Sequence, residues 1–300
     1  MAARPVSLSG GGFVLYALGG ALARERGPLD LRAYAVGQAF ITATQLMTHY
    51  CNDYFDQAAD AANLARTTWS GGSGVLQEGI LEPRTARAAA IALGAVALLL
   101  AVLGGVVCMP TAGTTVLVAI ALVLSWEYSA PPLRLHARGM GPATAAIVVG
   151  GLTPLVGFGM QGFPWTRSVF ATVVPLVLAQ FALNLVLDFP DADADAGAGK
   201  HTMVVLIGHL RARALAVCVV AAVYASLPGL ASAGAAAHLV VAVWATAPLG
   251  AWLTATLMRG AGRAGGPTSQ LTWAGVLWFA SIAIAELIAT GLDALGSGPL

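Results

Sequence analysis

Two short stretches of the sequence carry aspartates at the same spacing. Residues 52–60 read NDYFDQAAD (the first motif), and residues 187–195 read LDFPDADAD, of which 188–195 form the second motif. Both follow the pattern D-x2-D-x3-D, with Asp53, Asp56 and Asp60 in the first motif and Asp188, Asp191 and Asp195 in the second. Six carboxylates brought together cannot all stay ionised without a cation. Oxygen ligands without paired cysteines or histidines favour Mg²⁺, which usually also binds substrate phosphates.

Polar residues match upstream of the two motifs as well. Gln45 and His49 precede the first motif at the same offsets at which Gln180 and Asn184 precede the second. On a helix, these offsets keep each series of polar residues within an arc of about 80°. We therefore expect one polar stripe on each of two helices, facing protein or water, with these four residues several ångströms deeper than the aspartates.

Two residues of the second stretch interrupt this regularity. Pro190 removes a helical hydrogen bond, so we expect a kink in the second stripe at this position. Asp193 lies off the stripe and is expected to face solvent. The alternative interpretation is that all these aspartates are solvated loop residues just beyond helix ends, which the matched spacing and the matched upstream residues disfavour.

The elements that must position the motifs are apolar helices. The chain of 300 residues is 58% apolar and 10% charged, whereas an average soluble domain is about 25% charged. A bilayer-spanning helix needs about 20 mostly apolar residues, and such runs recur along the chain. We predict an all-α integral membrane protein, with one transmembrane domain over residues 1–300 and an internal duplication of about four helices. About nine membrane-spanning helices are expected, at 8–24, 33–52, 86–108, 112–128, 140–160, 168–187, 212–232, 236–257 and 270–291.

The basic residues indicate an orientation in the membrane. With the N-terminus in the cytoplasm, 11 of the 15 lysines and arginines lie on the cytoplasmic side, as the positive-inside rule requires. Both aspartate motifs then open to the cytoplasm, and we expect the protein in the cytoplasmic membrane. The net charge of +1 and the lack of a basic tract in the sequence predict no nucleic-acid partner.

Three further stretches accompany the motifs. They read RTTWSGGSGVLQEGILEPR after the first motif, YSAPPLRLHARGMG from Tyr128 and GKHTMVVLIG from Gly199. Together with the paired aspartate motifs, they resemble the UbiA superfamily of intramembrane prenyltransferases, over about 40 to 290. Within that superfamily the chain is most similar to the menaquinone-type branch, which prenylates dihydroxynaphthoate.

The resemblance implies a bundle of nine transmembrane helices around a central cavity, capped by cytoplasmic loops. It also implies an isoprenyl diphosphate substrate whose diphosphate binds Mg²⁺ at the two motifs. Members ionise the carbon–oxygen bond to an allyl cation, which alkylates an aromatic acceptor. That chemistry fits the residues, because metal ions neutralise charge on a leaving group and an apolar cavity shields a carbocation from water.

Individual residues take expected roles from the resemblance and from their positions. Asn52 and the six aspartates are the expected metal ligands, and four aspartates are expected to act directly in catalysis: Asp53, Asp56, Asp188 and Asp191. Of the deeper residues, His49 and Asn184 are expected to orient or deprotonate an aromatic ring, and the imidazole can act as a base near neutral pH. The alternative is that these two side chains simply hydrogen-bond each other between helices.

Four residues outside the motifs are expected to bind the diphosphate. Arg66 and Lys200 follow their motifs by six and five residues and could donate charge-assisted hydrogen bonds; the alternative is that they are ordinary cytoplasmic anchors. Tyr128 and Arg134 lie in a third loop, where the family usually places a tyrosine with a basic residue. The family's Y-x-x-x-K spacing is absent, because the arginine comes six positions after the tyrosine.

Two other functions are compatible with the motifs. A UbiA-type terpene cyclase would ionise a prenyl diphosphate such as geranylgeranyl diphosphate and cyclise it without an acceptor. A cation-coupled transporter also uses intramembrane carboxylates and internal repeats, but its sites lie near the bilayer midplane, whereas these aspartates lie at the ends of apolar spans. The preferred prediction is Mg²⁺-dependent transfer of a polyprenyl group to an aromatic quinone precursor such as dihydroxynaphthoate.

Overall fold

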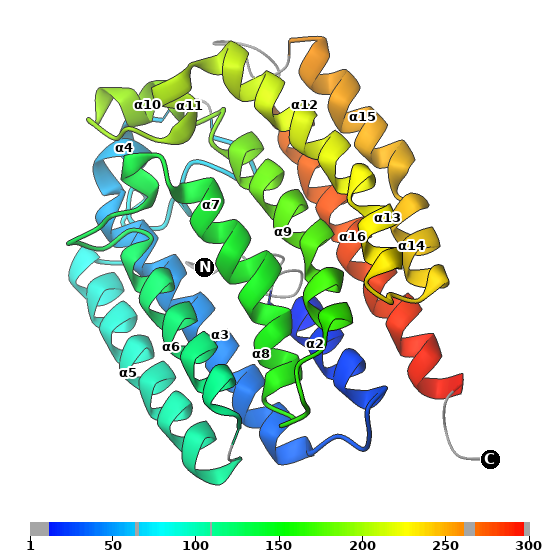
Figure 1. Ribbon diagram of the computed structural model, residues 1–300. Helices are drawn as coiled ribbons and strands as arrows, with labels where there is room; N and C mark the ends of the chain where they lie inside the picture. The colour runs from blue at the N-terminus through cyan, green and yellow to red at the C-terminus, as the bar shows by residue number, and fades with distance from the viewer. Residues whose placement is uncertain (1–11, 64–65, 109, 261–267, 297–300) are drawn as a thin grey trace.

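The computed structural model describes residues 12–63, 66–108, 110–260 and 268–296, with side chains to residue 292. Within these ranges all the regular structure is helical, as predicted. The helices lie alongside one another in a bundle (Figure 1). The first four residues of the first expected helix, 8–11, lie outside the described ranges, and its remainder contains α2 (Leu15–Arg24).

Two pairs of helices carry the motifs. The first motif lies where α3 (Leu31–Phe55) meets α4 (Gln57–Ala62), and the second lies where α9 (Arg167–Leu187) meets α10 (Ala192–Gly197). At the start of α3 the side chain of Asp30 accepts two backbone N–H groups, which fixes that end of the helix. The short helices α4 and α10 contact each other at one end of the bundle (Figure 1), so the two motifs converge there.

The other helices form the remainder of the bundle and its connections. They are α5 (Pro83–Val107), α6 (Ala112–Glu127), η2 (His136–Arg138), α7 (Gly141–Ala145), η3 (Ala146–Leu152), α8 (Thr153–Gly159), α11 (Met203–Ile207), α12 (His209–Ala225), α13 (Leu227–Ser232), α14 (Ala237–Trp244), α15 (Ala247–Met258) and α16 (Thr268–Gly296). Two helices that the sequence predicts as continuous are interrupted, between α12 and α13 and between α14 and α15. Pro228 and Pro248 stand in the first turn after each break, where the missing N–H costs no helical hydrogen bond.

The helices have the length and composition that a membrane requires. Six helical stretches among the described residues are long and apolar enough to cross a bilayer: Pro83–Val107, Gly141–Gly159, Arg167–Leu187, His209–Ser232, Ala237–Met258 and Thr268–Leu292. On α5 the side chains of Leu99, Val102 and Val106 are exposed, as contact with lipid allows. The chain is an integral membrane protein, while the count of nine spans, the internal duplication and the orientation stay predictions.

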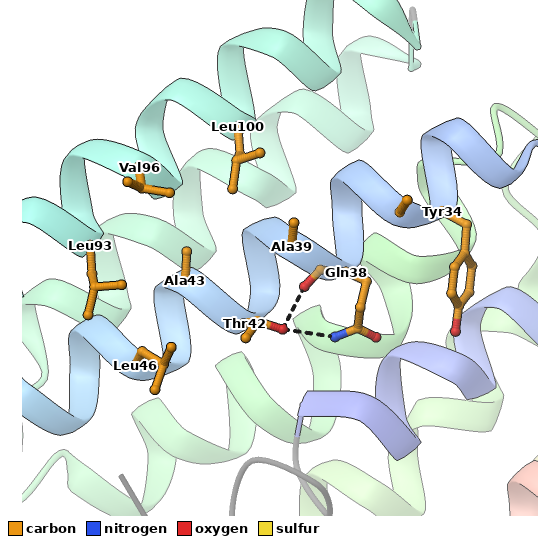
Figure 2. Close-up of a pocket in the computed structure, with 10 residues that line it drawn as sticks. Tyr34, Gln38, Ala39, Thr42, Ala43, Leu46, Leu93, Val96 and Leu100 are labelled. Carbon is orange, nitrogen blue, oxygen red and sulfur yellow. Dashed lines mark hydrogen bonds between the residues drawn. The ribbon is translucent and has the colours of Figure 1, made fainter. Parts of the chain in front are cut away.

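Two hollows lie against α3, and they differ in chemistry. The larger, of about 580 Å³, is an open groove between α3 and α5 (Figure 2). Its polar groups bond each other, because Gln38 Nε2 donates to Thr42 Oγ1 over 3.3 Å and the Thr42 hydroxyl donates to the Gln38 carbonyl over 2.9 Å (Figure 2). The smaller hollow, of about 410 Å³, is enclosed by residues of α3, α6, η3, α9 and α16 and contains both motifs. Size alone would favour the groove, but the carboxylates identify the smaller cavity as the candidate site.

Candidate active site

The smaller cavity combines a charged region with an apolar one. All six motif aspartates line it, together with the basic side chains of His136 and Lys200. Ile41, Leu183 and Phe279 are among the apolar side chains that line the remainder. The structure therefore brings the two motifs, which are far apart in the sequence, into one cavity.

The first motif keeps an almost continuous helical path. α3 continues to residue 55, and Asp56 then caps it and begins the short α4. Because the path is interrupted at only this residue, the spacing still turns the three carboxylates of the motif inward. Asp53, Asp56 and Asp60 are only 6%, 6% and 9% exposed, in agreement with the expected stripe. Asn52 lies beside them, and its amide donates to Asp56 Oδ2 over 2.5 Å.

The second motif has a different backbone. α9 ends at Leu187, and the chain then turns before α10 begins. Pro190 has no N–H and disfavours helix at the residue before it, so the predicted kink is instead a helix end. Asp188 at the end of α9 and Asp195 in α10 nevertheless point into the interior, and both are buried. Asp193 is exposed, as predicted.

Lys200 links the two motifs. Its Nζ lies 3.1 Å from Asp56 Oδ2 and 2.9 Å from Asp195 Oδ1. Burial alone would lower the pKa of Lys200, but these two carboxylates raise it above its ordinary value. The ammonium therefore stays charged at the charged end of the cavity, beside the aspartates at which a diphosphate is expected.

His136 makes a second bridge, which the sequence analysis missed. Its Nε2 lies 3.2 Å from Asp188 Oδ1, and its Nδ1 lies 3.8 Å from Asp56 Oδ2. The imidazole stacks on the ring of Tyr128, with centroids 5.1 Å apart and planes at 9°. Burial alone would lower the pKa of His136, but the hydrogen bond to Asp188 and the nearby carboxylate of Asp56 raise it to about 10. At neutral pH, in the absence of metal, the ring is a cation between the motifs.

The backbone of the third loop explains how His136 reaches the site. The N–H of Leu135 donates to the carbonyl of Glu127 over 2.8 Å, and the N–H of His136 donates to the carbonyl of Tyr128 over 2.9 Å. These bonds fold the loop back onto the end of α6. A histidine eight positions after the tyrosine was the available signal in the sequence, but nothing in that spacing predicts the fold-back.

The two arginines expected to bind diphosphate are outside the described lining of the cavity. Arg134 does not belong to the described lining of the cavity, so His136 is the basic residue that the third loop contributes. Arg66 is also outside that lining, and its Nη2 donates to the backbone carbonyl of Asp60 over 2.6 Å. That bond places the Arg66 guanidinium beside the first motif, and its role in diphosphate binding stays a prediction.

The deeper polar residues line the cavity as the helical phase predicts. Gln180 Nε2 donates to Asn184 Oδ1 over 2.5 Å, and Asn184 Nδ2 lies 3.4 Å from the hydroxyl of Tyr128. Gln45 and His49 line the same cavity from α3. The cavity thus offers amide, imidazole and phenol groups next to its charged end.

The aspartates fit a divalent cation. Burial and then the neighbouring carboxylate Asp56 raise the pKa of Asp60 to about 7. Burial and then Asp195 raise the pKa of Asp191 to about 7 as well. Burial is the larger cause of both shifts, and the repulsion between neighbouring carboxylates adds to it, so a bound cation would relieve that repulsion.

Two individual carboxylate oxygens also favour a bound cation. Asp188 Oδ2 and Asp195 Oδ2 are buried and have no hydrogen-bond partner within the described part of the chain. Across the described ranges, no three His, Cys, Asp or Glu side chains converge closely enough to hold an ion by themselves. Mg²⁺ typically binds one or two carboxylates and completes its shell with water and substrate phosphate, so this donor set suits it.

The sequence matches one family model and is similar to relatives in other organisms. Residues 13–264 match the model of the UbiA prenyltransferase family. The chain is 25% identical over 246 residues to the 1,4-dihydroxy-2-naphthoate octaprenyltransferase of Bacillus subtilis (strain 168), covering 82% of this chain and 77% of that protein. It is 30% identical over 236 residues to a digeranylgeranylglyceryl phosphate synthase of Halobacterium salinarum, covering 75% of this chain and 74% of that protein.

Solved structures show the same fold. A UbiA homolog from Aeropyrum pernix K1 in its apo form aligns with a TM-score of 0.70 at 18% identity, over 93% of this chain and 97% of that one. A UbiA homolog from Archaeoglobus fulgidus bound to DMAPP and Mg²⁺ aligns with a TM-score of 0.63 at 18% identity, over 96% and 97%. At this identity the likeness establishes the architecture.

Proposed function

The chain belongs to the UbiA prenyltransferase family, and from this premise we propose that it transfers a prenyl group from an isoprenyl diphosphate to an aromatic acceptor, with Mg²⁺ as cofactor. The aspartate motifs would then open to the cytoplasm, into which the charged diphosphate product can leave. The reaction would take place within the bundle, at the boundary between the charged and the apolar parts of the cavity.

One observation carries the proposal. Six aspartates and two basic side chains share the end of a cavity whose other walls are largely apolar. A prenyl diphosphate has the same division, with a highly charged head and a hydrocarbon tail. A purely ionic substrate would leave the apolar walls unused, and a hydrocarbon would leave the buried charges unpaired.

The metal would be held by the aspartates. Asp188 and Asp195 each present a buried oxygen that has no hydrogen-bond partner among the described residues. Asp60 and Asp191 have a raised pKa that a bound cation would lower. When bound, Mg²⁺ neutralises charge on the diphosphate leaving group. Lys200 and His136 are placed to donate charge-assisted hydrogen bonds to the same group.

The reaction divides between the two parts of the cavity. At the charged end, the bond between the allylic carbon and oxygen breaks, and its electron pair leaves with the diphosphate. In the apolar part, an aromatic carbon of the acceptor attacks the allyl cation, and the ring then loses a proton. His49 lines the cavity and is the side chain we assign to accept that proton. Gln180 and Asn184 would orient the acceptor's hydroxyl or carbonyl groups.

An aromatic acceptor suits the lining better than a phosphorylated one. The described lining contains three side chains that can carry positive charge, His49, His136 and Lys200. The last two are assigned to the diphosphate of the donor substrate, which leaves only His49 of these three for a second phosphate group. The amides and the imidazole next to the charged end match phenolic hydroxyls, and the Bacillus subtilis relative is named for a dihydroxynaphthoate.

The experiment is a product assay on purified protein in lipid nanodiscs. Geranylgeranyl diphosphate is supplied with Mg²⁺, with and without 1,4-dihydroxy-2-naphthoate, and released diphosphate and organic products are measured separately. We expect a prenylated naphthalene only when both substrates are present, and loss of turnover when EDTA removes the metal.

Two other results would replace the proposal. A hydrocarbon formed from geranylgeranyl diphosphate and Mg²⁺ alone would identify a terpene cyclase. Full turnover in excess EDTA, or no diphosphate release with prenyl diphosphates of several lengths, would contradict metal-assisted ionisation altogether.

A further inference from the structure

The segment from Arg66 to Gly74, which we call the clasp, hydrogen-bonds to both aspartate motifs. The backbone N–H of Gly71 donates to Asp191 Oδ2 over 3.1 Å. Ser73 donates twice to Asp53, from its N–H to Oδ1 over 3.3 Å and from its hydroxyl to Oδ2 over 2.8 Å. Two residues of the clasp, Gly71 and Ser73, therefore hold one carboxylate from each motif.

The middle of the clasp lies directly against a third aspartate. Gly72 has φ +69°, and a Cβ atom at this position would overlap Asp60 Oδ2. Glycine meets both demands, since it adopts positive φ readily and has no side chain. The backbone of the clasp is consequently in contact with the carboxylate.

Asp191 is held from the first motif's side at both of its oxygens. Asn63 follows the end of α4, and its Nδ2 donates to Asp191 Oδ1 over 2.7 Å. The Gly71 N–H takes the other oxygen. Asn63 and Gly71 thus fix both carboxylate oxygens of Asp191 relative to the first motif.

Both ends of the clasp are anchored. Near its start, the Thr67 hydroxyl accepts the N–H of Ser70 over 3.1 Å, which closes a tight turn. The ring of Trp69 packs edge-to-face on Trp273 of α16, with centroids 5.0 Å apart. Just beyond its end, Val75 is only 4% exposed. A segment fixed in this way can transmit a defined geometry to the carboxylates it contacts.

We propose that the clasp is a positioning element that holds Asp53, Asp60 and Asp191 at the mutual separation required by a Mg²⁺-bound diphosphate. The proposal rests on the proposed function. A carboxylate oxygen that accepts one hydrogen bond keeps a second lone pair for a cation. The clasp therefore orients the carboxylates and leaves them able to bind a metal ion. Groups that orient metal ligands typically contribute tenfold to a hundredfold in metal affinity.

Two glycines of the same backbone conformation allow a matched test. Gly72 and Gly79 both have φ +69°, but a Cβ atom at Gly79 would meet nothing within 4 Å. Gly72→Ala and Gly79→Ala therefore carry the same backbone strain, and only the former displaces Asp60. Ser73→Ala removes one clasp bond, and Ser73→Thr retains the hydroxyl.

The readout is binding, measured by calorimetry in nanodiscs with a non-ionisable prenyl thiodiphosphate at increasing Mg²⁺. For Gly72→Ala we expect the half-saturating Mg²⁺ concentration to rise by at least about tenfold, and for Ser73→Ala by about threefold. Gly79→Ala and Ser73→Thr should match the wild type. The KM for the aromatic acceptor should stay unchanged in all four variants.

The outcomes separate the clasp from the proposed function. If the wild type binds the analogue only with Mg²⁺ but Gly72→Ala and Ser73→Ala do so at the same Mg²⁺ concentration, the positioning role is overturned. A lower melting temperature and a smaller active fraction with unchanged half-saturating Mg²⁺ would also overturn it, in favour of a purely structural loop. If the wild type itself shows no Mg²⁺-dependent binding, the proposed function fails first.

Discussion

The two aspartate motifs share one spacing and differ in almost everything around it. The first lies on a nearly continuous helix, and Asp53 within it is held by the serine of the clasp. The second lies on a turn after Leu187, and Asp188 within it is held by an imidazole from a distant loop. Equal spacing in the sequence has therefore produced two different backbones with two different sets of partners.

The comparison shows that each basic side chain of the site contacts carboxylates from both motifs. Lys200 joins Asp56 of the first motif to Asp195 of the second, and His136 lies between Asp56 and Asp188. Neither motif has its charge compensated by its own segment alone. A substitution in one motif should therefore disturb the other, and the following predictions test how far the two are equivalent.

The largest expected effect comes from removing one carboxylate from either motif. Asp53→Ala and Asp188→Ala should each lower kcat/KM by at least about a hundredfold, because each removes roughly 2.7 kcal/mol or more of transition-state charge stabilisation. Steady-state kinetics of diphosphate release measure the effect. Asp193→Ala is the matched control on the second motif and should cost little, since that side chain is exposed. An Asp193 variant as damaged as the others would mean that α10 directs Asp193, too, into the site.

The bridge through His136 should come next in size. Replacing it with glutamine removes a cation that contacts Asp188, and charge-assisted bonds of 1.5–3 kcal/mol correspond to a loss of about tenfold to a hundredfold in kcat/KM. Arg134→Gln is the control from the same loop, and its kcat/KM should change by less than about twofold because Arg134 is outside the described lining. An equal loss of kcat/KM in the two variants would indicate that Arg134 also contacts the diphosphate from the third loop.

Metal-free stability should depend on pH through both motifs. Asp60 and Asp191 have a pKa raised to about 7, and His136 has one raised to about 10. A raised pKa means that the folded state binds protons more tightly than the unfolded state, so stability falls as pH rises through these values. In EDTA, the melting temperature should therefore fall between pH 6 and pH 9.

Added Mg²⁺ should offset that loss more at pH 8.5 than at pH 6, because deprotonated carboxylates bind the metal. The comparison needs only melting curves with EDTA and with Mg²⁺ at each pH, and Asp193→Asn should behave as the wild type. Stabilisation by Mg²⁺ that is larger at pH 6 than at pH 8.5 would contradict the assigned protonation states.

The smallest expected effect concerns an indole beside the clasp. Trp69 lines the cavity, and its buried Nε1 has no hydrogen-bond partner within the described chain. Trp69→Phe keeps a ring against Trp273 but removes the N–H that would donate to the bound diphosphate. The KM for the diphosphate should therefore rise by about fivefold, which corresponds to the loss of a hydrogen bond of roughly 1 kcal/mol. Trp273→Phe, which alters the other ring of the same pair, should leave that KM unchanged. An identical rise in both variants would assign the effect to ring packing.

The sequence determined the membrane class, the helical content and the inward face of each motif. Apolar composition and helical periodicity are local properties, so Gln45 and His49 on α3, and Gln180 and Asn184 on α9, could be assigned to one face from their spacing. The same argument correctly left Asp193 outside. The six aspartates could be predicted as a cation-binding set because their repeated pattern lies within short stretches of chain.

Only the tertiary structure decided which charges meet. The placement of His136 depends on backbone bonds that fold a loop onto the end of α6, and the choice of His136 over Arg134 follows from that fold-back. The clasp reaches Asp53 and Asp191 because positive-φ glycines allow a close approach between segments far apart in the chain. Spacing fixes the face of a helix that a side chain occupies, whereas contacts between distant segments depend on how the loops close and the helices pack.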